Sequence, residues 1–382
     1  MGPPLLHVWP ALCDPLDCSR ATRPACRTES VQLMPKWGTR RLWTASGPSH
    51  RRCTNDPRAT ASLPCWAAMR RLSPLPDHLV RSPATRTTLL AEGLRPSEIR
   101  GRLWGPLHRG VRAWSHLPPD DAAVRVRAAA LVLPEGGALT GWGAAWVHGA
   151  TTLDGAGRPV EVTVPTALRV RRPELRVRHS ALGPGDLAHR DGLPVTSPTR
   201  CAFDLARYGW SDEEAVVGLD VVLAAGLVSL AGLRAYVAAH PGWRGVPRAR
   251  RACSLADPAA ESPMETRLRM LWLEAGLPAP RANVDVGDAR GRFLGRVDLL
   301  DEEAGLVGEY DRADHRTATR HAADNRREEP LEAVGLTVTR FVASDVWGAR
   351  AAARARLQAA WHRAMARDRS CDAWTLPSSS TP

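Results

Sequence analysis

Two neighbouring stretches decide the fold of the C-terminal part of the chain. They are Arg292-Phe293-Leu294-Gly295-Arg296-Val297-Asp298-Leu299-Leu300 and Leu306-Val307-Gly308-Glu309-Tyr310-Asp311. Both are short apolar runs bounded by turn residues, a pattern typical of β-strands. Asp298, Glu309 and Asp311 interrupt these runs, and a carboxylate within an apolar strand is unfavourable unless it binds something. We therefore predict two adjacent strands whose carboxylates belong to a site.

Further elements are predicted on both sides of these strands. A helix begins at Ser262 and carries an apolar stripe that ends at Gly276. The pattern then predicts a strand at 283–286, a polar helix at about 317–329, a strand at 336–342 and a long helix to about residue 365. This α-β-β-β-α-β-α order defines a domain over residues 262–367. The polar tail, 368–382, is expected to be disordered.

Residues 84–114 contain two short helices and a hairpin-like tail. The first helix ends at Gly93, a residue suited to a helix C-terminus, and the second runs from Pro96 to Trp104. Helix, short turn, helix and basic hairpin is the plan of a winged helix-turn-helix, whose second helix enters the major groove of DNA. We predict such a module over residues 69–118; the alternative is a small helical subdomain with solvated arginines. The candidate DNA-contacting residues are Arg95, Arg100, Arg102, Arg109 and Arg112.

The other segments are less informative. Residues 119–240 predict a mixed α/β middle region without any spacing typical of catalysis. Residues 241–261 have the composition of a basic linker. Residues 1–68 show neither strand nor helix periodicity, so we expect a disordered or mispredicted extension, with Met69 as the natural start.

Composition bears on location and partners. The net charge is +12, but only one of the 52 basic residues is a lysine, so part of the arginine excess reflects a GC-rich genome. The charge is therefore modest support for DNA as a partner. No apolar stretch approaches the roughly 18 residues of a membrane span, and the chain does not open like a signal peptide. We expect a cytoplasmic protein without a membrane partner.

The acidic residues of the two strands suit metal-assisted chemistry. Hydrolysis of a phosphodiester needs an ion such as Mg²⁺ that activates water and offsets charge on the phosphate oxygens. These ions take oxygen ligands, often one or two carboxylates plus water and substrate. Glu309 and Asp311 share one strand face because side chains alternate, and Asp298 on the neighbouring strand can project to the same place. The candidate cofactor is Mg²⁺ or Mn²⁺.

A family resemblance rests on motifs that occur in a fixed order. They are Ser262-Pro263-x-Glu265, Arg296-Val297-Asp298-Leu299, Glu309-Tyr310-Asp311-x-x-Asp314-His315, Asp324-x-x-Arg327 and Gly335-Leu336-x-Val338-x-Arg340. Over about residues 262–345 the chain resembles the family related to very-short-patch-repair endonucleases, a branch of the restriction-endonuclease-like PD-(D/E)xK superfamily. Residues 84–240 resemble the winged-helix and linker region of AbiEi-type antitoxins, through Leu107–Val111 and Leu193–Arg200.

The first resemblance implies a set of candidate catalytic residues. Asp298 and Glu309 would hold the metal, and Glu265 would be an outer or accessory ligand. Asp311 is either a ligand or the partner of an arginine, and His315 either orients water or phosphate or lies on a loop. Glu265 also has the capping-box spacing from Ser262, which by itself stabilises the helix.

The chain departs from the superfamily pattern at one catalytic position. The usual lysine would fall at Asp311, and no lysine follows Lys36. An arginine, His315 or a second metal would then have to stabilise the transition state. Arg312 also stands where the family commonly has glycine, and Pro330 is expected to end or kink its helix.

These observations lead to one expected fold class and three functions. The fold is α/β (mixed α+β), with a winged-helix-like module, a mixed middle region and a restriction-endonuclease-like C-terminal domain. The favoured function is Mg²⁺-dependent binding and cleavage of DNA. The alternative is a DNA-binding regulator or antitoxin-like protein that keeps the nuclease fold without turnover. The third is an interaction module for a partner protein in a toxin–antitoxin or defence pair.

Overall fold

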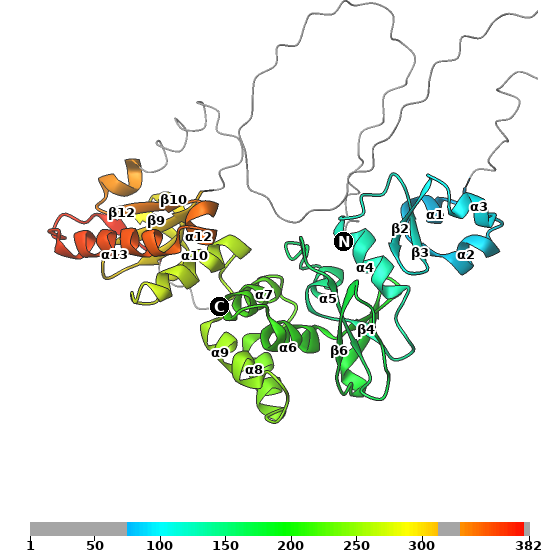
Figure 1. Cartoon of the computed structure of the whole chain (residues 1–382). Helices are drawn as coiled ribbons and strands as arrows, with labels where there is room; N and C mark the ends of the chain where they lie inside the picture. The colour runs from blue at the N-terminus through cyan, green and yellow to red at the C-terminus, as the bar shows by residue number, and fades with distance from the viewer. Residues whose placement is uncertain (1–74, 312–328, 378–382) are drawn as a thin grey trace, which may run out of the picture. The chain divides into compact units, whose positions relative to one another are not determined.

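The computed structural model of the protein describes residues 75–311 and 329–377. The chain divides into Met1–Arg70 and Arg71–Pro382, and every described element lies in the second unit. The described strands form three sheets that follow one another along the sequence (Figure 1). This combination of helices and mixed sheets confirms the predicted α/β (α+β) fold class.

The first sheet has three short strands in the order β1-β3-β2. Thr85 starts the second helix, because its hydroxyl accepts a hydrogen bond of 3.0 Å from the backbone N–H of Thr88. Gly110 turns the β2–β3 hairpin with a φ of +87°, a left-handed conformation that glycine adopts at little cost. The elements are α1 (Asp77–Arg81), β1 (Ala84–Thr85), α2 (Arg86–Ala91), α3 (Pro96–Ile99), β2 (Trp104–His108) and β3 (Val111–Trp114).

Along the chain, these elements are a helix, a strand, two helices and a hairpin. The sequence pattern predicted neither α1 nor β1 and indicated a longer second helix than the structure has. That helix ends at Ile99 rather than at Trp104. Trp104 instead begins β2, where it pairs with Trp114, and the two indole rings pack edge to face with centroids 5.4 Å apart.

The second sheet, in the middle region, has the order β6-β5-β4-β8-β7. The β4–β8 and β5–β6 pairs are parallel, and the β4–β5 and β7–β8 pairs are antiparallel. The strands are β4 (Ala138–Leu139), β5 (Val160–Val164), β6 (Leu175–His179), β7 (Leu187–Arg190) and β8 (Leu193–Thr196). The helices are α4 (Ala122–Ala130), α5 (Gly141–His148), α6 (Pro198–Tyr208), α7 (Asp212–Ala224), α8 (Leu230–Ala239) and α9 (Val246–Leu255).

Helix α9 corrects the predicted basic linker at 241–261. Val246, Ala249, Ala252 and Cys253 are buried on one side of this helix and belong to the core of the middle region. Their spacing is helical, but arginines and prolines surround them, so composition alone suggested a linker. The middle region therefore continues through residue 255.

The third sheet has the order β12-β11-β10-β9-β13, and only its β11–β12 pair is parallel. Helices α10 and α13 lie against one of its faces (Figure 1). Trp272 of α10, Leu357 of α13 and Phe341 of β12 belong to one apolar cluster. The strands β9 to β12 and the helices α10 and α13 occur in the predicted order, whereas α12 was not predicted. The predicted polar helix falls almost wholly outside the described residues. The elements are α10 (Pro263–Glu274), β9 (Arg281–Asp288), β10 (Phe293–Asp301), β11 (Leu306–Tyr310), β12 (Thr337–Phe341), α12 (Ala343–Trp347), α13 (Arg350–Ala366) and β13 (Trp374–Thr375).

The segment after Asp368 also differs from its prediction as a disordered tail. Trp374 and Thr375 form β13, which pairs antiparallel with β9 opposite Asp288 and Gly287. Trp374 packs against the apolar cluster on that side of the sheet. The apolar surface that this indole covers offsets the cost of ordering the chain end.

Within the residues that the structure describes, no helix combines the length and the apolar character that crossing a membrane would require.

Candidate functional site

The arginines predicted to contact DNA flank α3 or belong to the β2–β3 hairpin: Arg95 precedes the helix, and Arg100 and Arg102 follow it. Arg100 and Arg102, which follow α3, are exposed, and their guanidinium groups make no hydrogen bond or ion pair with any other described residue. Arg109 at the hairpin turn is also exposed. These three side chains are therefore available to phosphate groups.

The other two arginines of this set have partners within the protein. Arg95 forms an ion pair with Glu98, and the same carboxylate accepts a hydrogen bond of 2.8 Å from the backbone N–H of Arg95. Arg112 donates a hydrogen bond of 2.9 Å to the carbonyl of Trp104. Arg95 thus helps to close the first turn of α3, and Arg112 joins the two hairpin strands.

Glu265, the predicted accessory metal ligand, lies buried in the first turn of α10. Its backbone N–H donates to the hydroxyl of Ser262 at 3.2 Å, which is the helix cap. Its carboxylate accepts hydrogen bonds from the side-chain amide of Asn283 at 2.8 Å and from the backbone N–H of Glu261 at 2.9 Å. Glu265 therefore ties the start of α10 to β9.

The strand carboxylates lie close to one another along the third sheet. Asp298 lies between Val297 and Leu299, whose partners on β9 are Val284 and Ala282, so it is level with Asn283. On its other side, the carboxylate of Asp298 accepts a hydrogen bond of 2.7 Å from the backbone N–H of Tyr310.

Glu309 immediately precedes Tyr310 and pairs in register with Arg340 of β12. The backbone N–H of Asp311 donates to the carbonyl of Phe341 at 2.8 Å, just beyond the end of β11. His315 lies outside the described residues. The structure thus places Asp298 and Glu309 on adjacent strands, as the sequence predicted.

Glu265, Asp298 and Glu309 do not form a metal site from described residues alone. In residues 75–311 and 329–377, no three His, Cys, Asp or Glu side chains lie close enough together to hold a metal ion. The carboxylates of Glu265 and Asp298 already accept hydrogen bonds from N–H donors. A divalent ion would have to compete with these donors.

The middle region contains a buried network of charged and polar groups. At its centre is Asp204 of α6, which accepts hydrogen bonds from the Thr140 hydroxyl at 2.7 Å, from Arg200 at 3.1 Å and from Arg207 at 2.8 Å. Arg200, which is fully buried, also donates to Asp186 at 2.8 Å. Buried charges are stable only when paired and hydrogen-bonded in this way.

Glu161 of β5 lies beside this network, but its negative charge has weaker contacts with arginines than that of Asp204. Its Oε1 atom is 3.5 Å from Arg176 and 3.9 Å from Arg178 and accepts no hydrogen bond from a described residue. Burial raises the pKa of Glu161 to about 7, although the two arginines act in the opposite direction. Burial therefore favours the protonated form of Glu161.

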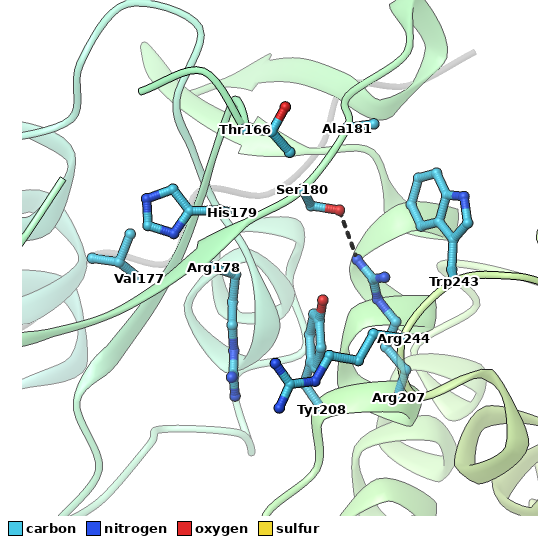
Figure 2. Close-up of a pocket in the computed structure, with 10 residues that line it drawn as sticks. All are labelled: Thr166, Val177, Arg178, His179, Ser180, Ala181, Arg207, Tyr208, Trp243 and Arg244. Carbon is cyan, nitrogen blue, oxygen red and sulfur yellow. Dashed lines mark hydrogen bonds between the residues drawn. The ribbon is translucent and has the colours of Figure 1, made fainter. Parts of the chain in front are cut away.

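A pocket of about 430 Å³ opens over one side of the network, and Figure 2 shows the residues that line it. The lining combines arginine and aromatic side chains and contains no carboxylate. Guanidinium groups beside rings form a surface suited to anions. The lining residues are Thr166, Val177, Arg178, His179, Ser180, Ala181, Arg207, Tyr208, Trp243 and Arg244.

The sequence analysis missed this pocket. A usable signal was the alternation of basic residues in β6, where Arg176 and Arg178 follow one another at period two. Trp243 and Arg244 lie in the segment that we predicted to be a linker, so their proximity to β6 was not foreseeable from spacing. The lining residues of β6 and those at 243–244 lie more than 60 positions apart in the sequence.

The middle region is similar to a known protein family. Residues 137–254 match the family model of the AbiEi antitoxin C-terminal domain. Two curated proteins of Mycobacterium tuberculosis, from strains CDC 1551 and H37Rv and both described as uncharacterized, are 28% identical to the chain over 188 residues. That alignment covers 47% of this chain and 68% of each relative. No solved structure matches. The matched family model supports the antitoxin-like resemblance.

Proposed function

We propose that the protein is a DNA-binding regulator of the antitoxin type, in which the winged-helix module contacts DNA and the middle region carries the antitoxin function. The observation that supports this proposal most directly is the set of exposed arginines that follow a helix and lie at the turn of a hairpin, upstream of a segment that matches an antitoxin domain. In winged helix-turn-helix proteins the second helix enters the major groove. Arg100 and Arg102 follow α3, and Arg109 tips the hairpin.

The DNA-binding part is tested by the salt dependence of binding. We expect duplex DNA to bind with an affinity that falls as salt rises, because arginines displace counterions from phosphates. Arg100→Ala and Arg102→Ala should each lower the slope of log K against log salt by about one when the lost contact is to a phosphate. Arg290→Ala, which removes an exposed arginine from the β9–β10 turn, is the charge-matched control. Equal slopes for all variants would refute the assignment.

We also propose that the middle region binds a toxin protein. The family match to residues 137–254 supports this, and so does the exposure of Trp210, whose side chain is 51% exposed beneath the guanidinium of Arg176 at 3.9 Å. Trp and Arg side chains supply much of the energy at protein interfaces. Co-purification with the protein encoded beside it tests the idea. Trp210→Ala should weaken the complex, whereas the exposed Trp347→Ala should not.

A second candidate function is Mg²⁺- or Mn²⁺-dependent cleavage of DNA by the C-terminal region. The observation that favours it is the row in which Glu265 contacts Asn283, Asn283 is level with Asp298, and Asp298 neighbours Glu309. Bound there, the ion would activate water and neutralise phosphate charge, with Asp298 and Glu309 as its ligands.

A nicking assay on supercoiled plasmid distinguishes the two functions. Cleavage that needs Mg²⁺ or Mn²⁺ and that is lost in Asp298→Ala, but kept in the exposed strand control Asp285→Ala, would establish the nuclease. Salt-sensitive retention of DNA without nicking is the result expected of a regulator.

A further inference from the structure

The arginine-lined pocket of the middle region provides positive charge without an acidic group in its wall. It is formed by the end of β6, by the last residues of α6 and by the turn before α9. Its volume of about 430 Å³ lies in the range of small-molecule sites. Any ligand that fills it must therefore match the guanidinium groups exposed there.

Arg207 forms the back of the pocket and is already neutralised. It is only 3% exposed, and its guanidinium donates to Asp204 at 2.8 Å and to the hydroxyl of Ser180 at 3.2 Å, the contact drawn in Figure 2. The same hydroxyl accepts a second hydrogen bond, of 2.8 Å, from Arg200. Because Ser180 accepts two hydrogen bonds, its own proton is available to a ligand.

Arg178 and Arg244 have donors that the described residues leave unused. The Nε atom of Arg178 is buried without a hydrogen-bond partner there, while its guanidinium lies 4.4 Å from the centroid of the Tyr208 ring. The carboxylate of Glu161 lies 3.9 Å from the guanidinium of Arg178. Burial raises the pKa of this carboxyl group, which favours its neutral form. Arg244 is exposed and forms no ion pair with any described residue. Both guanidinium groups belong to the wall of the pocket, where an anion would compensate their charge.

We propose that this pocket binds a terminal phosphate group, with Arg178 and Arg244 as the cationic ligands. Guanidinium groups match the oxygens of phosphate in pairs and form charge-assisted hydrogen bonds with them. The phosphate group belongs either to a free nucleotide or to the phosphorylated end of a nucleic acid strand. Both sources present the same dianionic group.

Binding of phosphorylated probes to the full chain tests the site. We would titrate inorganic phosphate, a nucleoside monophosphate and a 5′-phosphorylated dinucleotide by calorimetry, with the 5′-hydroxyl dinucleotide as reference. Arg244→Gln should weaken binding about tenfold, because it removes one charge-assisted hydrogen bond from an exposed position, without changing the melting temperature. Arg190→Gln on the exposed edge strand β7 makes the same charge change outside the pocket and should bind like the wild type.

Each outcome of the binding experiment either supports or contradicts the phosphate site. Binding that requires the phosphate and that weakens in Arg244→Gln alone supports the site, and the tightest probe identifies the source. Three findings would each overturn the proposal: no binding of any phosphorylated probe, equal binding of the 5′-hydroxyl dinucleotide, or unchanged affinity in Arg244→Gln. Duplex-DNA binding by the winged-helix module is measured separately, so failure here leaves that function untouched.

Discussion

At the scale of single residues, Asp204 neutralises most of the buried positive charge of the middle region. Its carboxylate is 1% exposed and accepts from both Arg200 and Arg207. Arg200 has a second carboxylate partner in Asp186, but Asp204 is the carboxylate that Arg207 contacts. Loss of this charge would leave Arg207 uncompensated in the interior.

We therefore expect Asp204→Asn to lower the free energy of unfolding by about 3 kcal/mol, the cost of breaking a buried ion pair by removing one partner. Urea denaturation followed by circular dichroism measures the change. Asp120→Asn, at an exposed position, should change stability by less than about 0.5 kcal/mol. A loss for Asp204→Asn as small as that of the control would contradict the role of the network.

The raised pKa of Glu161 leads to a prediction about how stability depends on pH. Its pKa is raised from 4.5 to about 7, first by burial and also by Asp204, against the effect of Arg176, Arg178 and Arg158. For an acid whose pKa is raised on folding, stability is full below the unfolded pKa and is lost as pH rises through the folded pKa. Between pH 4.5 and 7 the wild type should thus lose stability relative to Glu161→Gln, by on the order of 2 to 3 kcal/mol. Parallel stability profiles for the two proteins would rule this out.

At the scale of elements, the start of α9 holds the pocket together. Gly245 caps this helix with a φ of +85°, and a Cβ atom there would lie 2.5 Å from the backbone oxygen of Arg207. Trp243 and Arg244 immediately precede it. The close approach of two backbones therefore positions both pocket residues.

Gly245→Ala should destabilise the protein by about 3 kcal/mol, because it combines left-handed strain with a backbone clash. Gly242→Ala is the matched control: a Cβ atom there would meet nothing within 4 Å, and Gly242 has no positive φ. Thermal unfolding distinguishes the two variants. If both melt alike, the packing of α9 against α6 is not what the structure indicates.

At the scale of the whole molecule, the middle region and the C-terminal region share buried charges. Asp220 of α7 accepts hydrogen bonds from Thr266 at 2.9 Å and from Arg269 at 2.6 Å, both on α10. It also accepts from the backbone N–H of Asp257 at 2.8 Å, in the connection between the two regions. These contacts join α7 to α10 through a side chain that is 1% exposed.

Asp220→Ala should uncouple the two regions, because Arg269 would remain buried beside a missing carboxylate. Calorimetry should then resolve two unfolding transitions in place of one. Asp212→Ala removes an exposed carboxylate from the same helix, 2.9 Å from Arg248, and should leave the profile unchanged. A single transition at the wild-type temperature for Asp220→Ala would show that the contacts do not couple the regions.

Local patterns in the sequence predicted much of the fold and part of the site. The apolar runs at 292–300 and 306–311 predicted adjacent strands, and the structure does place Asp298 and Glu309 on neighbouring strands. The pattern did not predict α9, because arginines separate the apolar residues of that helix. It did not predict β13, because only two residues form that strand. Such elements are stable through tertiary contacts rather than through intrinsic preference.

What the sequence determined by itself is most of the series of strands and helices, because their periodicity depends on residues two to four positions apart. It also identified which residues carry charge. Only the tertiary structure decided which of these charges are neutralised. Arg207 meets Asp204 and Ser180, Arg100 meets no described partner, and Arg178 keeps a donor unused. The physical reason is that ion pairing depends on distances of a few ångströms between residues that are far apart along the chain.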